Sequence, residues 1–489
     1  MSFIGLDVGT TSARAIAFDD DGESLASSSR PLSTVRRRPG RIEQDPEQIL
    51  RSSIEVLEDL AERLPSPPRA IGIANQRETV TAWHRKKLEP LAPAISWQDR
   101  RGAPRCRELR LLGAEEHVSE VSGLRLDPYF SATKYSEIAS SLSGMPSANI
   151  ALGTVDSWLV AKLTGHGSPI TDFTNASRTS LFNINSGHYD KSLGALFDVP
   201  LELLPTPLPS NSMFGEISCR ELSKWQGVPI HAVLGDQQAS LFGQHCFGFG
   251  ECKATLGTGT FVLANTGNQR LGAQSGLITS IAWELSGIGT TYCLEGSIFS
   301  TASTLQWLID VMGIAESMEE LDSLARSIRS SDQVALIPFF DGTGSPWWAD
   351  SSSAMIAGLD TSSSKAHVAR AGFESIALQT AFVTDEIATQ LGGPVQALTL
   401  DGGLSNLDFL CQLIADQTSL QCNASSMAEA TAYGVAMMSA VGIGAIGLEE
   451  IANARRTRKS FDPSANRTAP RSRSKKWSGY LAKLGLVGE

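Results

Sequence analysis

The sequence predicts an α/β protein of two similar domains that face each other across a cleft. Its 489 residues are enough for two or three domains, each with its own hydrophobic core. A strand, a glycine- and threonine-rich turn and a second strand stand near the start of the chain, and the same pattern returns about half the chain later. We therefore expect a first domain over residues 1–248 and a second over 249–489, with a ligand between them.

The first hairpin is the stretch IGLDVGTTSARAIAF, which begins at Ile4. Apolar residues stand on both sides of its Gly-Thr-Thr turn, and Asp7 precedes the turn. Residues 23–32 can add a third strand after an Asp-Asp-Gly turn at 20–22. The chain thus opens with a three-stranded meander whose first turn is a rigid place for polar groups.

An amphipathic helix is predicted next. Asp45 suits the N-cap, Pro46 suits the first helical position, and Gln48 can close a capping box, while apolar residues recur at three- and four-residue spacing. A Pro-Ser-Pro-Pro segment then ends the helix. The apolar strand at 70–74 follows and delivers the polar sequence NQRET, residues 75–79, at its end.

The second hairpin lies at 254–264 and contains a Gly-Thr-Gly turn. A later strand at 397–400 ends in Asp-Gly-Gly, and Ser405 can cap the helix that follows. A glycine pair at the start of a helix lets backbone N–H groups approach a ligand closely. Both features therefore suit a bound anion.

Composition narrows the class of ligand. A net charge of −11 argues against a nucleic-acid partner, and no apolar run or leader-like start indicates a membrane segment. The seven cysteines are scattered without a C-x-x-C pair, which fits a reducing compartment, and we expect a cytoplasmic protein. The histidines form no zinc motif. A small-molecule substrate is the remaining expectation.

Phosphate binding is the chemistry that the two turns favour. They offer N–H groups and hydroxyls without bulky side chains, although the sequence has no Walker A motif. A G-x-G-x-x-G motif at Gly442 follows a helical segment rather than a strand, so it does not indicate a dinucleotide site. Asp7 and Asp236 each border an apolar strand and should project into the cleft. One would help hold hydrated Mg²⁺, and the other would deprotonate an attacking hydroxyl.

Together these motifs resemble those of the FGGY carbohydrate kinases, and within that family those of the members that act on glycerol. The similarity runs in order from residue 5 to about residue 440. Its segments are LDVGTTSARA, PGRIEQDPEQI, IANQRETV, WQDRR, GLRLDPYFSATK, GTVDSWLVAKLTG, TDFTNASRTSLFNI, GDQQASLFGQ, LGTGTF, LEGSIF, QWL, GLD with HVARAGFESIA, and LDGG.

The resemblance implies the actin-like ATPase fold, in which two ribonuclease-H-like domains close on MgATP and a polyol. Polyol hydroxyls would bind Arg77, Glu78, Tyr129, Asp236 and Gln237, and the rings of Trp97 and Phe261 would cover the carbon skeleton. The ATP side would comprise Thr10, Thr11, Ser12, Arg14, Thr258, Gln306, Gly402 and Gly403. Asp236 would be the catalytic base, and Asp7 and Asp236 would hold Mg²⁺ through water.

The implied reaction is ATP-dependent phosphorylation of glycerol to sn-glycerol 3-phosphate, by an enzyme that forms homodimers or homotetramers. A family kinase for dihydroxyacetone, erythritol or a pentulose remains an alternative, because a slightly larger pocket could accept another hydroxyl. An actin- or chaperone-like ATPase would need a peptide-binding domain, for which the tail beyond residue 440 is too short. A pseudoenzyme that binds without turnover is disfavoured by the presence of Asp7, Arg14 and Asp236.

The sequence departs from the glycerol-specific pattern at several places. Val8 stands where glutamine is usual, and the segment FDGTGSPWW from Phe340 and the segment GLDTS both differ from their counterparts. On the nucleotide side, Ala302 replaces a glycine and Leu407 an asparagine. The resemblance therefore defines the polyol contacts better than the adenine contacts.

Overall fold

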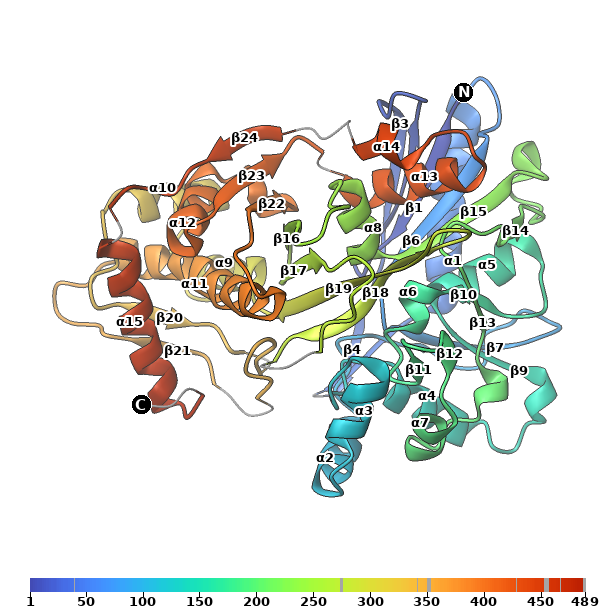
Figure 1. Ribbon diagram of the computed structural model, residues 1–489, viewed down its shortest axis with the longest axis horizontal. Helices are drawn as coiled ribbons and strands as arrows, with labels where there is room; N and C mark the ends of the chain where they lie inside the picture. The colour runs from blue at the N-terminus through green and yellow to red at the C-terminus, as the bar shows by residue number, and fades with distance from the viewer. Residues whose placement is uncertain are drawn as a thin grey trace.

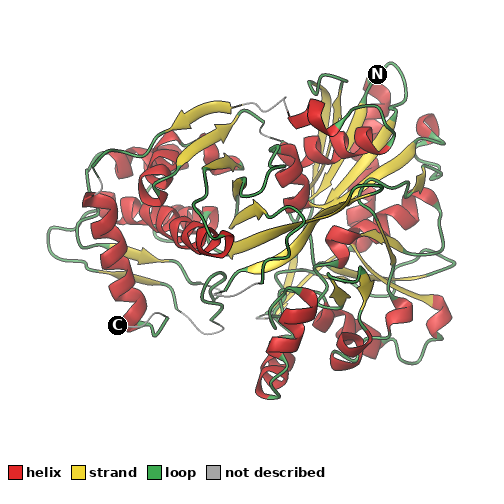
Figure 2. Ribbon diagram, viewed as in Figure 1, coloured by secondary structure: helices red, strands yellow, loops and turns green. Residues whose placement is uncertain are grey.

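The computed structural model describes residues 1–38, 40–272, 276–340, 342–349, 353–427, 429–452, 457–466 and 468–486. These residues form two lobes, each with a central sheet and helices packed on it (Figures 1 and 2). The first half of the chain, blue to green in Figure 1, forms one lobe, and most of the later chain forms the other. The predicted α/β class with two facing units is confirmed.

The first lobe is built on a six-stranded sheet. Three consecutive strands form the predicted antiparallel meander, in which Asp7 lies opposite Arg14, and β6 and β15 then extend the sheet in parallel. In spatial order the strands are β14 (Gly215–Glu216), β15 (Pro229–Gly235), β6 (Ala70–Asn75), β1 (Phe3–Val8), β2 (Ser12–Phe18) and β3 (Ser24–Pro31).

The second lobe is built on a seven-stranded sheet. Its spatial order is β18 (Ile278–Leu285), β19 (Gly289–Ile298), β17 (Thr260–Asn265), β16 (Cys252–Leu256), β22 (Ala397–Asp401), β23 (Gln421–Ser425) and β24 (Thr457–Phe461). Strand β17 runs antiparallel to its neighbours β19 and β16, and β22 and β23 continue in parallel from β16. This order of five strands repeats β3, β2, β1, β6 and β15 of the first sheet, which is the duplicated arrangement of the actin-like fold.

Smaller sheets complete the two lobes. A five-stranded sheet in the first lobe has the order β4 (Val35–Arg38), β5 (Arg41–Gln44), β8 (Ala94–Ile95), β7 (Val80–His84) and β9 (Ile150–Thr154). Three strand pairs are β10 (Ile170–Asp172) with β13 (Thr206–Leu208), β11 (Phe182–Asn183) with β12 (His188–Tyr189), and β20 (Ala335–Ile337) with β21 (Met355–Ala357).

Helices cover the sheets on both lobes. In the first half of the chain they are α1 (Pro46–Arg63), α2 (Ala103–Leu111), α3 (Glu115–Ser122), α4 (Ala132–Ser141), α5 (Val155–Thr164), α6 (Phe173–Ala176), α7 (Lys191–Leu196) and α8 (Asp236–Gly243). In the second half they are α9 (Ala302–Asp310), α10 (Met318–Arg326), α11 (Lys365–Leu391), α12 (Asp408–Thr418), α13 (Ala430–Gly442), α14 (Leu448–Ala452) and α15 (Thr468–Lys483). No helix within these described ranges is long and apolar enough to span a membrane.

Two predicted helix caps differ in detail. The Asp45 side chain caps α1 as expected, but Gln48 hydrogen-bonds Ser33 instead of closing a capping box. Helix α12 begins at Asp408 with Leu407 as its N-cap. Ser405 lies in the preceding turn, where its hydroxyl donates to the carbonyl of Gly402 at 2.7 Å. In both cases a nearby polar group offered the side chain another partner.

Helix α13 comes from the second half of the chain but packs on the sheet of the first lobe, against β1, β6 and α8 (Figure 1). Glycines on the two strands permit the close approach. A Cβ atom at Gly5 would lie 1.9 Å from the carbonyl oxygen of Ala432, and one at Gly72 would lie 2.2 Å from that of Val435. The first sheet is therefore completed by a segment that follows residue 248, and the expected division of the chain at that residue stays a prediction.

Candidate active site

A cavity of about 400 Å³ lies between the two lobes, where the turns of the two hairpins face each other. Seven expected polyol residues line it together with three expected ATP-side threonines: Arg77, Glu78, Trp97, Tyr129, Asp236, Gln237 and Phe261, with Thr10, Thr11 and Thr258. Thr255, Gly257 and Gly259 of the predicted second hairpin also line it, and so do three residues that were not expected at the site, Thr34, Arg36 and Gln98. Both sheets thus contribute to one polar pocket.

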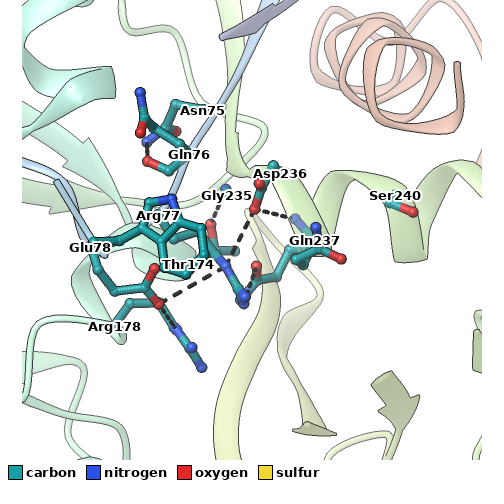
Figure 3. Close-up of polar contacts among 12 residues, drawn as sticks. Asn75, Gln76, Arg77, Glu78, Thr174, Arg178, Gly235, Asp236, Gln237 and Ser240 are labelled. Carbon is teal, nitrogen blue, oxygen red and sulfur yellow. Dashed lines mark hydrogen bonds and ion pairs between the residues drawn. The ribbon is translucent and has the colours of Figure 1, made fainter. Parts of the chain in front are cut away.

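Arg77 and Glu78 follow β6 after Gln76 and line the pocket, and Figure 3 shows their side chains. Their side chains are almost fully buried, at 2% and 1% exposure. Glu78 adopts a left-handed backbone conformation with φ of 62°, which is costly for a residue with a side chain. Its carbonyl accepts a hydrogen bond from Ser131 at 3.1 Å, and its carboxylate accepts one from Arg178 at 2.6 Å. Surrounding contacts therefore hold a strained residue at the pocket.

Asp236 stands at the point where β15 becomes α8, with its side chain 27% exposed to the cleft. Its Oδ1 lies 3.3 Å from Nε of Arg77 and accepts the backbone N–H of Gln237 at 2.7 Å (Figure 3). Desolvation by the surrounding protein raises the pKa of Asp236, although Arg77, the Gln237 N–H and Lys253 oppose the rise. The result is a carboxylate more basic than a solvated aspartate.

Three aromatic side chains form an apolar wall of the pocket. The rings of Trp97 and Tyr129 meet edge to face at 5.7 Å, and those of Trp97 and Phe261 at 6.5 Å. Nε1 of Trp97 donates to the Thr10 hydroxyl at 2.8 Å, which ties this wall to the first hairpin. Burial raises the pKa of Tyr129, so its hydroxyl stays protonated and can donate a hydrogen bond.

Hydrogen bonds within the turn and from Gln76 stabilise the turn of the first hairpin. Gly9 N–H donates to the Ser12 carbonyl at 3.0 Å, and the amide of Gln76 donates to the Gly9 carbonyl at 3.1 Å. Ser12 and Arg14 do not line the cavity, and the Arg14 guanidinium instead donates to the carboxylate of Glu429. In this structure the Arg14 side chain thus forms an ion pair with Glu429.

The remaining ATP-side residues gather around the second hairpin. The turn carbonyls of Gly257 and Thr258 accept N–H groups from the start of α9, the helix that carries Gln306. Gln306 is exposed and donates to Asp310 at 2.8 Å. Gly402 has φ of 82°, and a Cβ there would lie 2.7 Å from the Leu256 carbonyl oxygen, so it and Gly403 adjoin the same turn.

Three charged residues at the site escaped sequence reasoning. Arg178 and Glu295 are fully buried behind the pocket, and Lys253 donates to Oε1 of Gln237 at 2.6 Å. Lys253 lies between Cys252 and Ala254 on β16, and Glu295 follows Cys293 and Leu294 on β19. A single charge inside an apolar strand was the available signal, because such a charge needs a buried partner.

The donor set fits a divalent cation bound largely through water and phosphate. Desolvation, followed by the charges of Asp236 and Glu429, raises the pKa of Asp7 to about 7, with Arg14 opposing. Carboxylates that destabilise one another in this way favour a cation between them. The described parts of the chain hold no group of three or more His, Cys, Asp or Glu residues able to enclose a metal. Of the two expected Mg²⁺ ligands, Asp236 lines the cavity and Asp7 does not, and Glu429 is a third carboxylate close to Asp7.

Fold and pocket together define a two-lobed kinase of the actin-like class, in which two glycine- and threonine-rich turns suited to phosphate binding face a small polar pocket. Residues 2–243 match the N-terminal domain of the FGGY family of carbohydrate kinases, and residues 252–443 match its C-terminal domain. The chain belongs to this family.

Relatives and solved structures agree with this assignment. A glycerol kinase of Acinetobacter baylyi is 38% identical over 100% of both chains, and one of Trichlorobacter lovleyi is 40% identical over 91% of this chain and 90% of its own. The crystal structure of Plasmodium falciparum glycerol kinase with ADP superposes with a TM-score of 0.90 at 26% identity, covering 99% and 98% of the two chains. A xylulose kinase from Lactobacillus acidophilus, at 19% identity and a TM-score of 0.89 over 99% and 98%, shares the fold.

Proposed function

We propose that this protein transfers the γ-phosphoryl group of ATP to glycerol and forms sn-glycerol 3-phosphate. The observation that carries the proposal is the pocket itself, in which Arg77, Glu78 and Asp236 meet beneath three aromatic rings. Glycerol kinases about 38% identical over the full chain support the choice of substrate.

A triol has little apolar surface, so its affinity must come from charged hydrogen-bond partners in a desolvated site. Arg77 would donate to hydroxyl oxygens, Glu78 would accept from a hydroxyl, and Tyr129 and Gln237 would complete the set. Trp97 and Phe261 would contact the carbon skeleton. A ligand lacking one hydroxyl would leave a buried hydrogen-bonding group of the pocket without its ligand partner, which is the physical basis of selectivity.

Asp236 would act as the base. Its carboxylate would take the proton of the terminal hydroxyl while that oxygen attacks the γ-phosphorus and ADP leaves. The raised pKa of Asp236 favours proton acceptance, and Arg77 at 3.3 Å keeps the carboxylate oriented. Because Asp236 follows β15 directly and is the first residue of α8, its backbone is held at a junction of two regular elements rather than in a loop.

Thr10, Thr11, Ser12 and Arg14 would bind phosphate oxygens, and Thr258, Gln306, Gly402 and Gly403 would line the rest of the nucleotide. Arg14 would exchange Glu429 for a phosphate when ATP binds. Asp7 and Asp236 would hold Mg²⁺ through water, and the ion would offset negative charge on the phosphates.

The molecular context is part of the proposal. We expect residues 1–248 to supply the polyol and phosphate contacts and 249–489 the nucleotide contacts, in a cytoplasmic homodimer or homotetramer. Analytical ultracentrifugation with and without glycerol would establish the oligomeric state.

Product identity tests the proposed reaction. Purified protein is incubated with MgATP and glycerol, the phosphorylated product is identified by ³¹P NMR, and its configuration by a stereospecific glycerol-phosphate dehydrogenase. We expect stoichiometric ADP and sn-glycerol 3-phosphate. A different phosphate ester, or free phosphate alone, would contradict the proposal.

A further inference from the structure

Two charged side chains lie behind the polyol pocket without lining it: Arg178, just after α6, and Glu295, on β19. Both are fully buried. Glu295 belongs to the second sheet, but the neighbouring strand β18 is attached to the first lobe, where Thr279 N–H donates to the Gly123 carbonyl at 2.9 Å. The β18–β19 hairpin therefore carries a carboxylate from one sheet to the substrate-binding residues of the other.

Glu295 grips Arg77 with both oxygens. Nη1 of Arg77 donates to Oε2 at 2.6 Å, and Nη2 donates to Oε1 at 3.0 Å, which is the two-point geometry that orients a guanidinium plane. Arg178 and Ser297 also donate to Oε1, each at 3.1 Å. Burial opposes ionisation of Glu295, but Arg178 and Arg77 outweigh it and hold its pKa at about 2. The carboxylate is therefore charged throughout the working pH range.

Arg178 performs the equivalent task for Glu78. Its Nε donates to Oε1 of Glu78 at 2.6 Å, and its Nη1 donates to the Ser280 hydroxyl at 2.8 Å (Figure 3 shows the Arg178–Glu78 pair). Its guanidinium also lies over the Tyr129 ring at 5.6 Å. Arg178 thus touches two expected polyol ligands while staying outside the cavity.

The four residues form a closed, neutral arrangement of two arginines and two glutamates. Glu295 occupies both terminal nitrogens of Arg77, so Nε is the nitrogen that faces Asp236, at 3.3 Å. Nη1 and Nη2 of Arg77 also donate to Gln238 at 3.3 Å and to the Tyr129 hydroxyl at 3.5 Å, but both contacts are long and both acceptors are uncharged. Without the Glu295 charge, the attraction of the Asp236 and Glu78 carboxylates would turn the Arg77 guanidinium toward them. The direction in which Arg77 presents its donors therefore depends on a residue of the other sheet.

We propose that Glu295 and Arg178 are positioning residues of the polyol pocket: Glu295 orients Arg77, Arg178 orients Glu78, and together they set the affinity for the polyol. This inference rests on the proposed function. It means that the second sheet contributes to polyol binding through Glu295, in addition to the nucleotide contacts expected of the second domain.

A second buried triad provides a matched control. Glu374 on α11 accepts from Arg370 at 2.9 Å and from Arg473 at 3.3 Å, so it too is a buried carboxylate between two arginines. None of these three residues lines the cavity. Removing the charge of Glu374 measures how much stability is lost when a buried carboxylate between two arginines is neutralised. An effect of Glu295 on glycerol binding that Glu374 does not share is therefore specific to the pocket.

The experiment compares Glu295→Gln, Glu295→Asp, Arg178→Lys and Glu374→Gln with the wild type in steady-state assays that vary glycerol and ATP separately. Thermal unfolding is measured for each. We expect Glu295→Gln to raise KM for glycerol about 10- to 100-fold, with KM for ATP changed less than about 2-fold. Glu295→Asp keeps the charge and should recover part of the affinity. Arg178→Lys cannot bridge two carboxylates and should raise KM for glycerol as well.

Glu374→Gln should lower the melting temperature without changing KM for glycerol. If Glu295→Gln lowers stability as Glu374→Gln does and leaves KM for glycerol unchanged, the positioning role is wrong. If Glu295→Gln fails to fold, the positioning role is judged from Glu295→Asp and Arg178→Lys, and it is wrong if both leave KM for glycerol unchanged. If the wild type prefers another polyol, the proposed function fails, and the variants are compared on that polyol because the inference concerns Arg77. A wild type that binds no polyol overturns both.

Discussion

The surroundings of Asp236 decide whether its carboxylate can act as a base. Three groups lower its pKa, namely Arg77, the N–H of Gln237 and Lys253, but desolvation is the larger effect and raises it. The same protein atoms that desolvate the carboxylate also fix its direction, because it follows a central strand and contacts a guanidinium that is itself held. The packing around Asp236 therefore both raises its pKa and fixes the direction of its carboxylate.

Asp236→Asn should lower kcat by at least about 100-fold, since a positioned base contributes roughly 10²–10⁴ in rate. The amide keeps the shape of the side chain but cannot accept the proton. ATP binding, followed by calorimetry, should survive. Glu55→Gln, which removes a surface partner of Arg30, serves as the control and should leave kcat unchanged. Near-normal turnover of Asp236→Asn would remove Asp236 from the base role.

Asp156 predicts a pH dependence of stability away from the pocket. It is fully buried on α5, accepts from Thr171 at 2.6 Å, and has its pKa raised from 3.8 to about 7, chiefly by desolvation. The folded protein therefore holds a proton that the unfolded chain releases above pH 3.8. This stabilisation is complete below that pH and is lost as the pH rises through 7.

Asp156→Asn should therefore gain stability relative to the wild type as the pH rises from 4 to 8, by about 2–4 kcal/mol. The measurement is the difference in unfolding free energy between the two proteins at each pH, by urea titration. Comparing the pair cancels the titration of other groups. A difference that does not change with pH would show that Asp156 is not buried in its neutral form.

Single residues also mark the limit of sequence reasoning at the site. Arg77, Glu78 and Asp236 could be found because each follows an apolar strand and stands in a recognisable motif. Glu295 and Lys253 could not be paired with their partners, because the contacts Arg77–Glu295 and Gln237–Lys253 join different sheets. Local patterns carry no information on such cross-lobe pairs.

Two hairpins organise the active cleft at the level of secondary structure. Each connects antiparallel strands through a glycine- and threonine-containing turn, and each turn reaches the same cavity. Turn residues, apolar strand segments and the three- and four-residue spacing of a helix are local properties, so the sequence predicted both hairpins, the meander and α1 correctly. The caps at Gln48 and Ser405 were wrong, because neighbours brought close by the fold compete for the same side chains.

The packing of α13 on the first sheet was not predictable, since it joins residues more than 350 positions apart, such as Gly72 and Val435. What the sequence did contain was glycine inside β1 and β6, at Gly5 and Gly72, where a strand usually prefers larger residues. Those glycines indicate that another backbone segment packs closely on the strands, but the sequence does not identify that segment as α13.

Gly72→Ala should destabilise the protein by about 1–3 kcal/mol, because the added methyl would press against the backbone of α13. Thermal or urea unfolding measures the loss. Gly144→Ala is the matched control, since a Cβ there meets nothing within 4 Å. Equal stability of the two variants would contradict the close packing of α13 on β6.

At the scale of the whole molecule, the cavity exists only because the two lobes face each other. Thr10, Arg77 and Asp236 come from the first sheet and its connections, whereas Thr255, Thr258 and Phe261 come from the second. Closure of such lobes around MgATP and a polyol would exclude water and so protect ATP from hydrolysis. A low rate of phosphate release without polyol is the expected consequence.

The measurement that tests the central claim most directly is an ADP-release assay across glycerol, dihydroxyacetone, erythritol, ribulose and xylulose, with free phosphate followed in parallel. We predict that glycerol gives much the highest kcat/KM and that phosphate release without polyol is slow. A higher kcat/KM for another polyol would contradict glycerol as the substrate, and ADP formation with equal free phosphate and no dependence on polyol would contradict phosphoryl transfer itself.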